Sequence, residues 1–595
     1  MLQSKITFFK GITHMTEETY IKGKDYSLES TIKMMYKKLA DIGIHIKEIS
    51  ALNPVPFVYS QHIRDESCDL MFTNGKGTSE KACLASALGE YFERLSCNYF
   101  FADYYLGEEV AKSEFVHYPN EKWFNFDLEK NTMPSGLLNE ALWAYFDPED
   151  ELHPSQIFEL NSGAGERGIC ALPFVRQSDT QTIYFPVNII ANIFVSNGMS
   201  AGNTKNEARV QALSEIYERY AKNKIIAEGI CLPQIPEAVM QRFPDIQTSI
   251  EKLEAYGYHL RLCDASLGGV YPVISVTLIN PKDGSVFASF GAHPCFEVAL
   301  ERTVTELLQG RSLEMLNDFH APSFNAAEVA DHHNLETHFI NATGLLSYEF
   351  FKEKSDYTFV DWDFSADTKS ELAYLSDIAK TQGFEIYSAD YEHLGVYTCR
   401  ILIPGMSDIY PIEDLLWNNN NEGAYFREAI LSLKNLEKED MLAILENFEE
   451  GEHSDMLKIA EFIGIAPDAG TPWASLQAGE LKAMLYLALG EHEEAQTWVK
   501  WCTHMADLEV KRTNIYRCLD AMLSITLEKK EFKSYETSLV QMYTKECVNI
   551  CQEILSQKVT FYGLHSPGLG LDGFQKHMHL LEGYKKVQKA KINKF

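Results

Sequence analysis

Two stretches of the chain carry the same pattern of acidic and basic residues, a pattern that could hold metal ions and phosphate. They read SALGEYFER (86–94) and QALSEIYER (211–219). Each places two glutamates three residues apart and ends on an arginine: Glu90, Glu93 and Arg94 in the first, Glu215, Glu218 and Arg219 in the second. Residues three and four apart share one face of a helix. Each stretch should therefore present a small patch of carboxylates beside a guanidinium.

One such string alone is explained by a surface ion pair between Glu90 and Arg94, worth about 0.3–0.5 kcal/mol. Two copies that align over nine positions without a gap favour a further interpretation. If the two helices pack side by side, four carboxylates gather, and they repel each other unless cations bridge them. Mg²⁺ takes oxygen ligands from carboxylates and phosphates, and arginine can bind phosphate through two hydrogen bonds. The repeated block therefore predicts a magnesium–phosphate site.

A third segment and a polar loop supply further candidates. Arg302 and Glu306 stand four residues apart in a run that reads as a helix over 296–311. The loop SNGMSAGNTKNE precedes the second block and is rich in small polar residues. Helix starts of this kind bind anions, although Asn203 or Thr204 could equally serve as an ordinary N-cap.

Other nucleotide and hydrolase motifs are missing or incomplete. NGKGTS (74–79) lacks the first glycine of GxxxxGK[ST], because Leu70 occupies that position. We interpret this segment as a turn into the helix that follows. The sequence contains no GxSxG, HExxH or GxGxxG element, which disfavours serine hydrolases, zinc proteases and dinucleotide-binding enzymes.

The elements that must position these residues come as strand pairs followed by helices. Strand-like runs lie at 57–77, 184–196 and 271–293. Helices are predicted after them, from Ser79 in the first case and at 296–311 in the last. Pairing of the hairpin type favours antiparallel or mixed sheets with helices packed on one face, which is an α+β fold.

The predicted secondary structure changes at a polar segment, NNNNEG, near residue 420. Beyond it the sequence reads as helices, and the turn at Leu489-Gly490 is typical of a tetratricopeptide-like hairpin, although a generic helical bundle fits as well. The basic tail YKKVQKAKINKF is predicted to cap this helical domain. The predicted parts are an N-terminal extension with Met15 as an alternative start, an α+β domain and an all-α domain, at 1–14, 15–420 and 421–595.

Composition narrows the class of protein further. Lys and Arg number 53 and Asp and Glu number 85, giving a net charge of −32 over 595 residues. Such a surface repels nucleic-acid phosphates and suits a basic protein partner. The twelve cysteines form no CxxC pair, and no apolar run is long enough for a signal peptide or membrane span. We expect a protein of the reducing cytoplasm that binds neither nucleic acid nor membrane.

Three ordered motifs give a resemblance to a known family. Ser86-x-x-x-Glu90-x-x-Glu93-Arg94 matches the Sx₃ExxER signature of YcaO proteins, and SAGNTKNEARVQALSEIYERY and ALERTVTELLQGR match the second and third ATP-site segments of that family. The likeness covers nearly the whole chain from about Met15. It implies an ATP-binding α+β domain with ATP and Mg²⁺ as cofactors. Many members phosphorylate a peptide amide oxygen, which lets a thiol, hydroxyl or sulfide add to form azolines or thioamides.

The resemblance also assigns residues at the matching positions, although it assigns no catalytic acid, base or nucleophile. The implied Mg²⁺ ligands are Glu90, Glu93, Glu207, Glu215 and Glu218. The implied ATP contacts are Lys24, Thr31, Ser86, Arg94, Ser200, Asn203, Gln211, Arg219, Arg302 and Glu306.

Two departures bear on the reaction. Peptide cyclodehydratases of the family end in a PxPxP tail, whereas this chain ends in KAKINKF, and it has no fused domain of the ubiquitin-activating type. Resemblance to stand-alone members implies instead an ATP-hydrolysing accessory factor in β-methylthiolation of a small-subunit ribosomal protein. Its partners would be that protein and its radical-SAM methylthiotransferase. The alternatives are a nucleotide-binding adaptor without chemistry of its own and an azoline- or thioamide-forming enzyme. The apolar faces of the helical tail also predict a homodimer.

Overall fold

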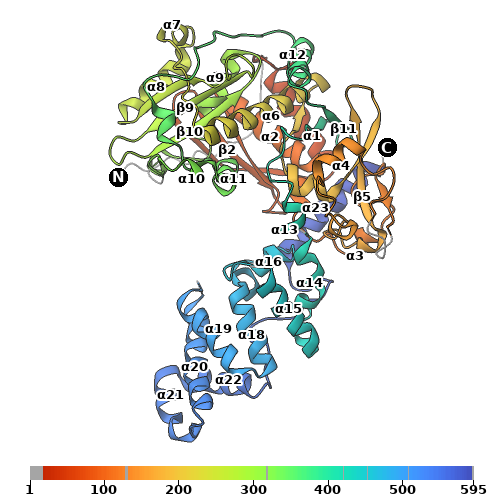
Figure 1. Cartoon of the computed structure of the whole chain (residues 1–595), viewed down its shortest axis with the longest axis vertical. Coiled ribbons are helices and arrows are strands. Elements are labelled where there is room, and N and C mark those ends of the chain that lie inside the picture. The colour runs from red at the N-terminus through yellow and green to blue at the C-terminus, as the bar shows by residue number, and fades with distance from the viewer. Residues whose placement is uncertain are drawn as a thin grey trace.

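The computed structural model describes residues 18–126, 132–316, 319–419, 421–451, 453–506 and 508–592. The predicted extension over 1–14 and the alternative start at Met15 lie outside these residues. Figure 1 shows an upper lobe that holds the sheets and a lower lobe built from helices. Within the part of the chain described, no helix is both long and apolar enough to cross a membrane.

All pairings between the named strands are antiparallel, as the sequence predicts for an α+β fold. Three sheets result, with strand orders β1-β2-β3, β10-β9-β8 and β4-β5-β11-β12-β7, and β6 lies beside β5. The strands are β1 (Ile46–Val55), β2 (Val58–Asp65), β3 (Phe72–Gly77), β4 (Lys122–Phe124), β5 (Ile169–Arg176), β6 (Thr182–Pro186), β7 (Met199–Gly202), β8 (His259–Asp264), β9 (Val273–Ile279), β10 (Val286–Ala292), β11 (Tyr387–Tyr391) and β12 (Tyr397–Leu402).

Three helices of the upper lobe carry most of the predicted site residues, and each follows a strand: α2 after β3, α6 after β7 and α9 after β10. Ser79 and Thr204 cap α2 and α6 by accepting backbone hydrogen bonds. The helices of this lobe are α1 (Leu28–Asp41), α2 (Glu80–Ser96), α3 (Glu108–Ala111), α4 (Glu140–Phe146), α5 (Val187–Ile189), α6 (Lys205–Glu228), α7 (Glu237–Met240), α8 (Pro244–Ala255), α9 (Phe296–Leu307), α10 (Ala326–Ala330), α11 (His332–Ile340), α12 (Thr368–Thr381) and α13 (Asp414–Trp417).

Each of the three site helices packs very closely on the strand before it, because that strand has a glycine at the contact. A Cβ atom on Gly75 would lie 2.2 Å from a carbonyl oxygen of α2. On Gly202 it would lie 2.7 Å from a backbone nitrogen of α6, and on Gly291 2.5 Å from one of α9. Side chains cannot fit at these separations. The three glycines therefore fix how deeply the helices sit against the sheets.

The strand predicted over 184–196 is wrong beyond its first residues. The strand β6 ends at Pro186, and the chain continues as α5 and a π-helical turn that reaches Phe194. Within this turn the Asn192 side chain donates to the Asn188 carbonyl four residues back, at helical spacing. An apolar run that is buried on all sides shows no periodicity, so its residues do not distinguish a strand from a helix.

The lower lobe is helical, as predicted. Its α18 and α19 form a hairpin, and Gly490 ends α18 with a φ of +77°, in the left-handed region that favours glycine. The tetratricopeptide-like character of this hairpin stays a prediction. The helices of the C-terminal region are α14 (Glu422–Leu431), α15 (Lys438–Glu450), α16 (Ile459–Phe462), α17 (Pro472–Ser475), α18 (Ala478–Leu489), α19 (His492–His504), α20 (Val510–Leu527), α21 (Glu536–Tyr543), α22 (Lys545–Leu555) and α23 (Gln575–Ile592).

The last helix, α23, does not cap the helical lobe as the sequence analysis predicts. It returns to the upper lobe (Figure 1), where Tyr584 packs edge-on against Phe101 with ring centroids 4.8 Å apart. The Lys591 amine is fully buried and donates hydrogen bonds to Asn98 Oδ1 (2.6 Å) and to the His117 carbonyl oxygen (2.7 Å). The amphipathic pattern of the tail shows that one face is buried, but not against which lobe.

The burial of Lys591 makes the stability of the folded protein depend on pH. It lowers the pKa of the amine from 10.5 to about 7, so between these values the unfolded chain binds a proton that the folded chain does not. Stability should rise with pH across this window and fall as pH drops through about 7. We expect Lys591→Met to flatten the rise in unfolding free energy by about 1.4 kcal/mol per pH unit between about pH 7.5 and 9.5, measured by urea denaturation. The exposed Lys585→Met control should keep the wild-type slope, and an unchanged slope in Lys591→Met would contradict the assignment.

Candidate nucleotide site

A cleft of about 1000 Å³ opens in the upper lobe between α2, α6 and α9. It is lined by every residue that the sequence analysis assigns to ATP or Mg²⁺. Helix α2 contributes Ser86, Glu90, Glu93 and Arg94, helix α6 contributes Glu207, Gln211, Glu215, Glu218 and Arg219, and helix α9 contributes Arg302 and Glu306. The remaining predicted contacts come from the N-terminal segment, α1, β7 and the loop before α6: Lys24, Thr31, Ser200 and Asn203.

Both intrahelical ion pairs that explain a single Glu-x-x-Glu-Arg string are present. Arg94 Nη2 lies 2.7 Å from Glu90 Oε1, and Arg219 Nη1 lies 2.6 Å from Glu215 Oε1. The two strings also face a common space. Burial raises the pKa of Glu93 well above its usual value, and the charge of Glu215 on the other helix raises it further. The two Glu-x-x-Glu-Arg blocks thus form ion pairs within their own helices, and their glutamates also line the cleft between the helices.

Burial likewise raises the pKa of Glu218, although the nearby Lys76 opposes this effect. A bound cation would stabilise the ionised form of these partly buried carboxylates. Carboxylate oxygens are ligands that suit a hard ion such as Mg²⁺. The glutamates are spread along the cleft, since no three of the described carboxylates bring oxygens within 4.8 Å of one another. Ligands of a single Mg²⁺ ion lie about 3–4 Å apart. The residues therefore fit cations distributed along a polyphosphate better than one tightly enclosed ion.

Comparisons with known proteins identify the family of this chain. Residues 74–407 match the family model described as YcaO cyclodehydratase, ATP- and Mg²⁺-binding, and residues 423–593 match the YcaO cyclodehydratase C-terminal domain. The chain belongs to the YcaO family. The predicted cofactors, ATP and Mg²⁺, are those that the description of the family model names. The domain boundary predicted near residue 420 lies between the two matched ranges and stays a prediction.

Two full-length relatives are similar to this YcaO chain. The ribosomal protein S12 methylthiotransferase accessory factor YcaO of Escherichia coli is 53% identical over 579 residues, which cover 96% of this chain and 99% of the relative. A Haemophilus influenzae protein is 52% identical over 583 residues, covering 97% and 99%. Among solved structures, YcaO from Methanopyrus kandleri bound with AMPPCP and Mg²⁺ is 17% identical with a TM-score of 0.41, covering 66% of this chain and 95% of that chain.

Glu207 lies in the YcaO cleft but in a different environment from the other glutamates. Its carboxylate accepts hydrogen bonds from the Asp25 backbone N–H (3.0 Å) and the Asn203 side chain, and Lys24 Nζ lies 3.3 Å away. Burial acts to raise the pKa of Glu207, but Lys24 and these donors outweigh it and lower the pKa overall. In this arrangement Glu207 ties the N-terminal segment to α6. To bind Mg²⁺ it would have to exchange these hydrogen bonds.

Arg302 on α9 connects the end of β10 to α6 in the cleft wall. Its guanidinium donates to the Ala292 carbonyl oxygen at the end of β10 (2.9 Å) and to Gln211 Oε1 on α6. The Ala292 N–H in turn donates to Glu218 Oε2 (3.1 Å). Arg302 is thereby oriented by the strand before its own helix and by the helix that carries Glu218.

Two lysines of the cleft were missed by the sequence analysis. Lys76 forms an ion pair with Glu306, and burial lowers the pKa of its amine. Residues 74–77 of the segment interpreted as a turn are the last residues of β3, which agrees with the strand-like run predicted over 57–77. Asn74 and Lys76 of this strand line the cleft. Lys222 stands one helical turn after Glu218, and burial lowers its pKa to about 8. Strand alternation and helical spacing were the signals that would have found them.

Proposed function

We propose that this YcaO protein binds Mg·ATP in the cleft between α2, α6 and α9, hydrolyses ATP and uses the phosphoryl group to activate a peptide amide. The convergence of the two Glu-x-x-Glu-Arg blocks with Arg302 on one cleft supports this proposal. Phosphoryl transfer depends on alignment and charge neutralisation more than on a covalent protein group. A cleft lined by half-buried carboxylates and guanidinium groups supplies both when cations and triphosphate are bound.

In this proposal the protein side chains divide into two sets. Glu90, Glu93, Glu215 and Glu218 hold the Mg²⁺ ions, which when bound neutralise the phosphate charge. Four of the cationic side chains that line the cleft bind phosphate oxygens directly: Arg94, Arg219, Arg302 and Lys76. The N-terminal segment, which is bonded to Glu207 of α6, also lines the cleft. Asn203 and Thr31 line it as well, and the Thr31 hydroxyl donates to Asn203 Oδ1 (2.9 Å).

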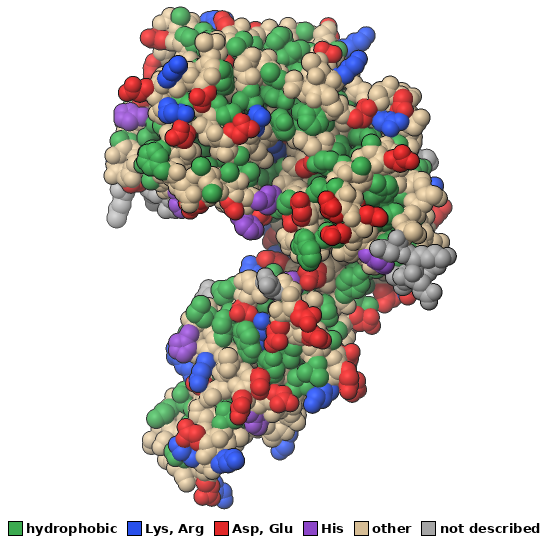
Figure 2. Space-filling model, viewed as in Figure 1, with side chains coloured by type: hydrophobic (Ala, Val, Ile, Leu, Met, Phe, Trp, Pro, Cys, Tyr) green, Lys and Arg blue, Asp and Glu red, His purple; other side chains and the backbone are tan. Residues whose placement is uncertain are grey.

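We extend this proposal to a physiological role through the E. coli relative, whose name makes it an accessory factor of the ribosomal protein S12 methylthiotransferase. This chain would then support β-methylthiolation of that protein in the cytoplasm, with the methylthiotransferase as its partner. The net charge of −32 suits a basic protein substrate. Figure 2 shows Asp and Glu side chains distributed over the visible faces of both lobes and a hollow between the lobes on one side.

Phosphate release from the purified full-length protein with ATP and Mg²⁺ tests the enzymatic proposal. We expect release that requires Mg²⁺ and increases when the methylthiotransferase and ribosomal protein S12 are added. A release rate equal to that of the buffer control, with and without these partners, would contradict it.

The adaptor alternative makes a different prediction in cells. If nucleotide serves only to shape the protein, cells that carry Glu218→Gln should still methylthiolate S12 although the purified variant no longer releases phosphate. Mass spectrometry of S12 distinguishes the two functions. The homodimer predicted from the helical tail is tested separately by sedimentation of the same preparation.

A further inference from the structure

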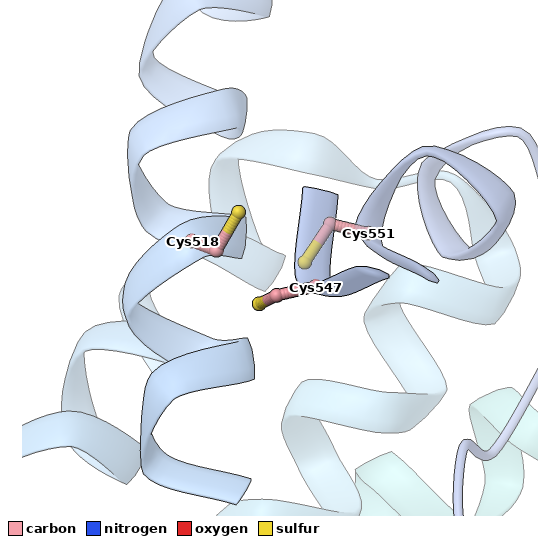
Figure 3. Close-up of side chains that lie close together, drawn as sticks. All are labelled: Cys518, Cys547 and Cys551. Atoms are coloured by element: carbon pink, nitrogen blue, oxygen red, sulfur yellow. The ribbon is translucent and has the colours of Figure 1, made fainter. Parts of the chain in front are cut away.

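Three cysteines of the helical lobe point toward one another. Cys518 lies on α20, and Cys547 and Cys551 lie one turn apart on α22 (Figure 3). Their three Sγ atoms all lie within 4.8 Å of one another, and all three residues are buried. Across the described ranges, no other set of three His, Cys, Asp or Glu side chains brings its ligand atoms this close. The helices that carry them contribute nothing to the nucleotide cleft.

A fourth sulfur atom lies beside the cluster. Met522 Sδ is 3.8 Å from Cys518 Sγ, one turn further along α20, and Met522 is buried in the same apolar core. The Cys547 and Cys551 thiols otherwise reach only backbone carbonyl oxygens of α20, at 3.7 and 3.6 Å, which are weak hydrogen bonds. Three thiol sulfur atoms therefore lie together between α20 and α22, and the Met522 sulfur adjoins one of them.

Buried cysteines often serve only as small apolar side chains. The distances between these sulfur atoms therefore have to be compared with the distances that a metal site requires. Zinc–sulfur bonds are about 2.3 Å long, which places three sulfur ligands of one ion about 4 Å apart. The three Sγ atoms lie within 4.8 Å of one another, so small side-chain movements would bring them to this separation. Loss of two weak thiol hydrogen bonds costs little in comparison.

We propose that Cys518, Cys547 and Cys551 bind one thiophilic d¹⁰ cation, Zn²⁺ or Cu⁺, with Met522 as a weak fourth donor. Ligands that are all sulfur select such soft ions over Mg²⁺ or Ca²⁺. The bound ion cross-links α20 to α22 and stabilises the helical lobe, because binding energy at a site formed only in the folded chain adds to folding energy. The sequence analysis saw no zinc pattern, since the third cysteine comes from another helix.

Metal titration of the reduced, chelator-treated full-length protein tests this proposal. Co²⁺ should produce the thiolate-to-cobalt absorption band, and native mass spectrometry should show one Zn²⁺ or one Cu⁺ ion per chain. Competition with a Zn²⁺ chelator and, without oxygen, with a Cu⁺ chelator identifies the preferred ion. We expect binding to raise the thermal midpoint of unfolding.

Cys518→Ser and Cys551→Ser should each weaken binding at least tenfold. The matched control is Cys502→Ser, which alters a buried cysteine of α19 outside the cluster and should leave binding unchanged. Should the serine variants fail to fold, alkylation of the wild-type protein replaces them, because the ion should protect these three cysteines and not Cys502. Absence of a stoichiometric ion in both metal titrations, or equal alkylation of all four with and without metal, would overturn the proposal.

Discussion

Glu93→Gln should make the ligand-free protein more stable and at the same time remove most of the Mg²⁺-dependent ATP hydrolysis that we propose for it. Burial, together with the charge of Glu215, raises the pKa of Glu93, so the ionised side chain costs stability when no cation is bound. Glutamine keeps the shape and removes this charge. Hydrolysis should fall about 100-fold or more, as when a charge-stabilising group of an active site is lost. Thermal unfolding and phosphate release of the same sample measure both effects.

The pH dependence of this stabilisation has a definite sign. An acid whose folded pKa is raised binds more protons folded than unfolded, so its contribution to stability falls as pH rises above the unfolded value of 4.5. The advantage of Glu93→Gln over wild type should therefore grow as the pH is raised above that value. In wild type, Mg·ATP should raise the unfolding midpoint, and the variant should lose that increase.

The matched control is Glu228→Gln at the end of α6. Glu228 is exposed, lies outside the cleft and pairs with Lys224 Nζ at 3.1 Å, so the substitution should change neither hydrolysis nor the Mg·ATP-induced midpoint. Wild-type hydrolysis in Glu93→Gln, or a less stable ligand-free variant, would contradict the role assigned to Glu93.

Helical spacing was enough to predict which side chains share a face of α2, α6 and α9. It was not enough to show that these faces meet, because this depends on how deeply each helix sits on its strand. The family resemblance supplied that convergence, and the cleft agrees with it for residues as distant as Glu93 and Arg302. The roles of individual residues as ligands of Mg²⁺ or ATP stay predictions.

The features that the sequence analysis did not predict have a common physical origin. Lys76 was hidden by glycines that read as a turn but that in β3 serve close packing against α2. The run ending at Phe194 is buried, and the helix that carries Lys591 buries one face. In both cases the apolar pattern predicts burial but not which segment covers it. Cys518 meets Cys547 and Cys551 only through the packing of two helices. In each case the missing information is a contact between segments distant in sequence.

Gly291→Ala should destabilise the protein strongly and weaken ATP binding from a position that does not itself line the cleft. The added Cβ atom would lie 2.4 Å from Thr303 Oγ1, 2.5 Å from its backbone nitrogen and 2.7 Å from the Ala299 carbonyl oxygen. Two of these atoms belong to the backbone of α9 and cannot rotate away, so strand and helix must separate. Overpacking of this kind costs about 3 kcal/mol, measured as the unfolding free energy in urea.

The same displacement should reach the nucleotide through Arg302. Residue 302 lies on the displaced helix, and its guanidinium depends on the Ala292 carbonyl oxygen and on Gln211 for its orientation. We therefore expect the KM for ATP to rise at least tenfold in Gly291→Ala, in the folded fraction at low temperature. Gly570→Ala is the control, because its Cβ atom would meet nothing within 4 Å and its φ is not positive; its stability should stay within about 1 kcal/mol of wild type. Wild-type stability and KM in Gly291→Ala would show that the close strand–helix contact does not set the position of the third site helix.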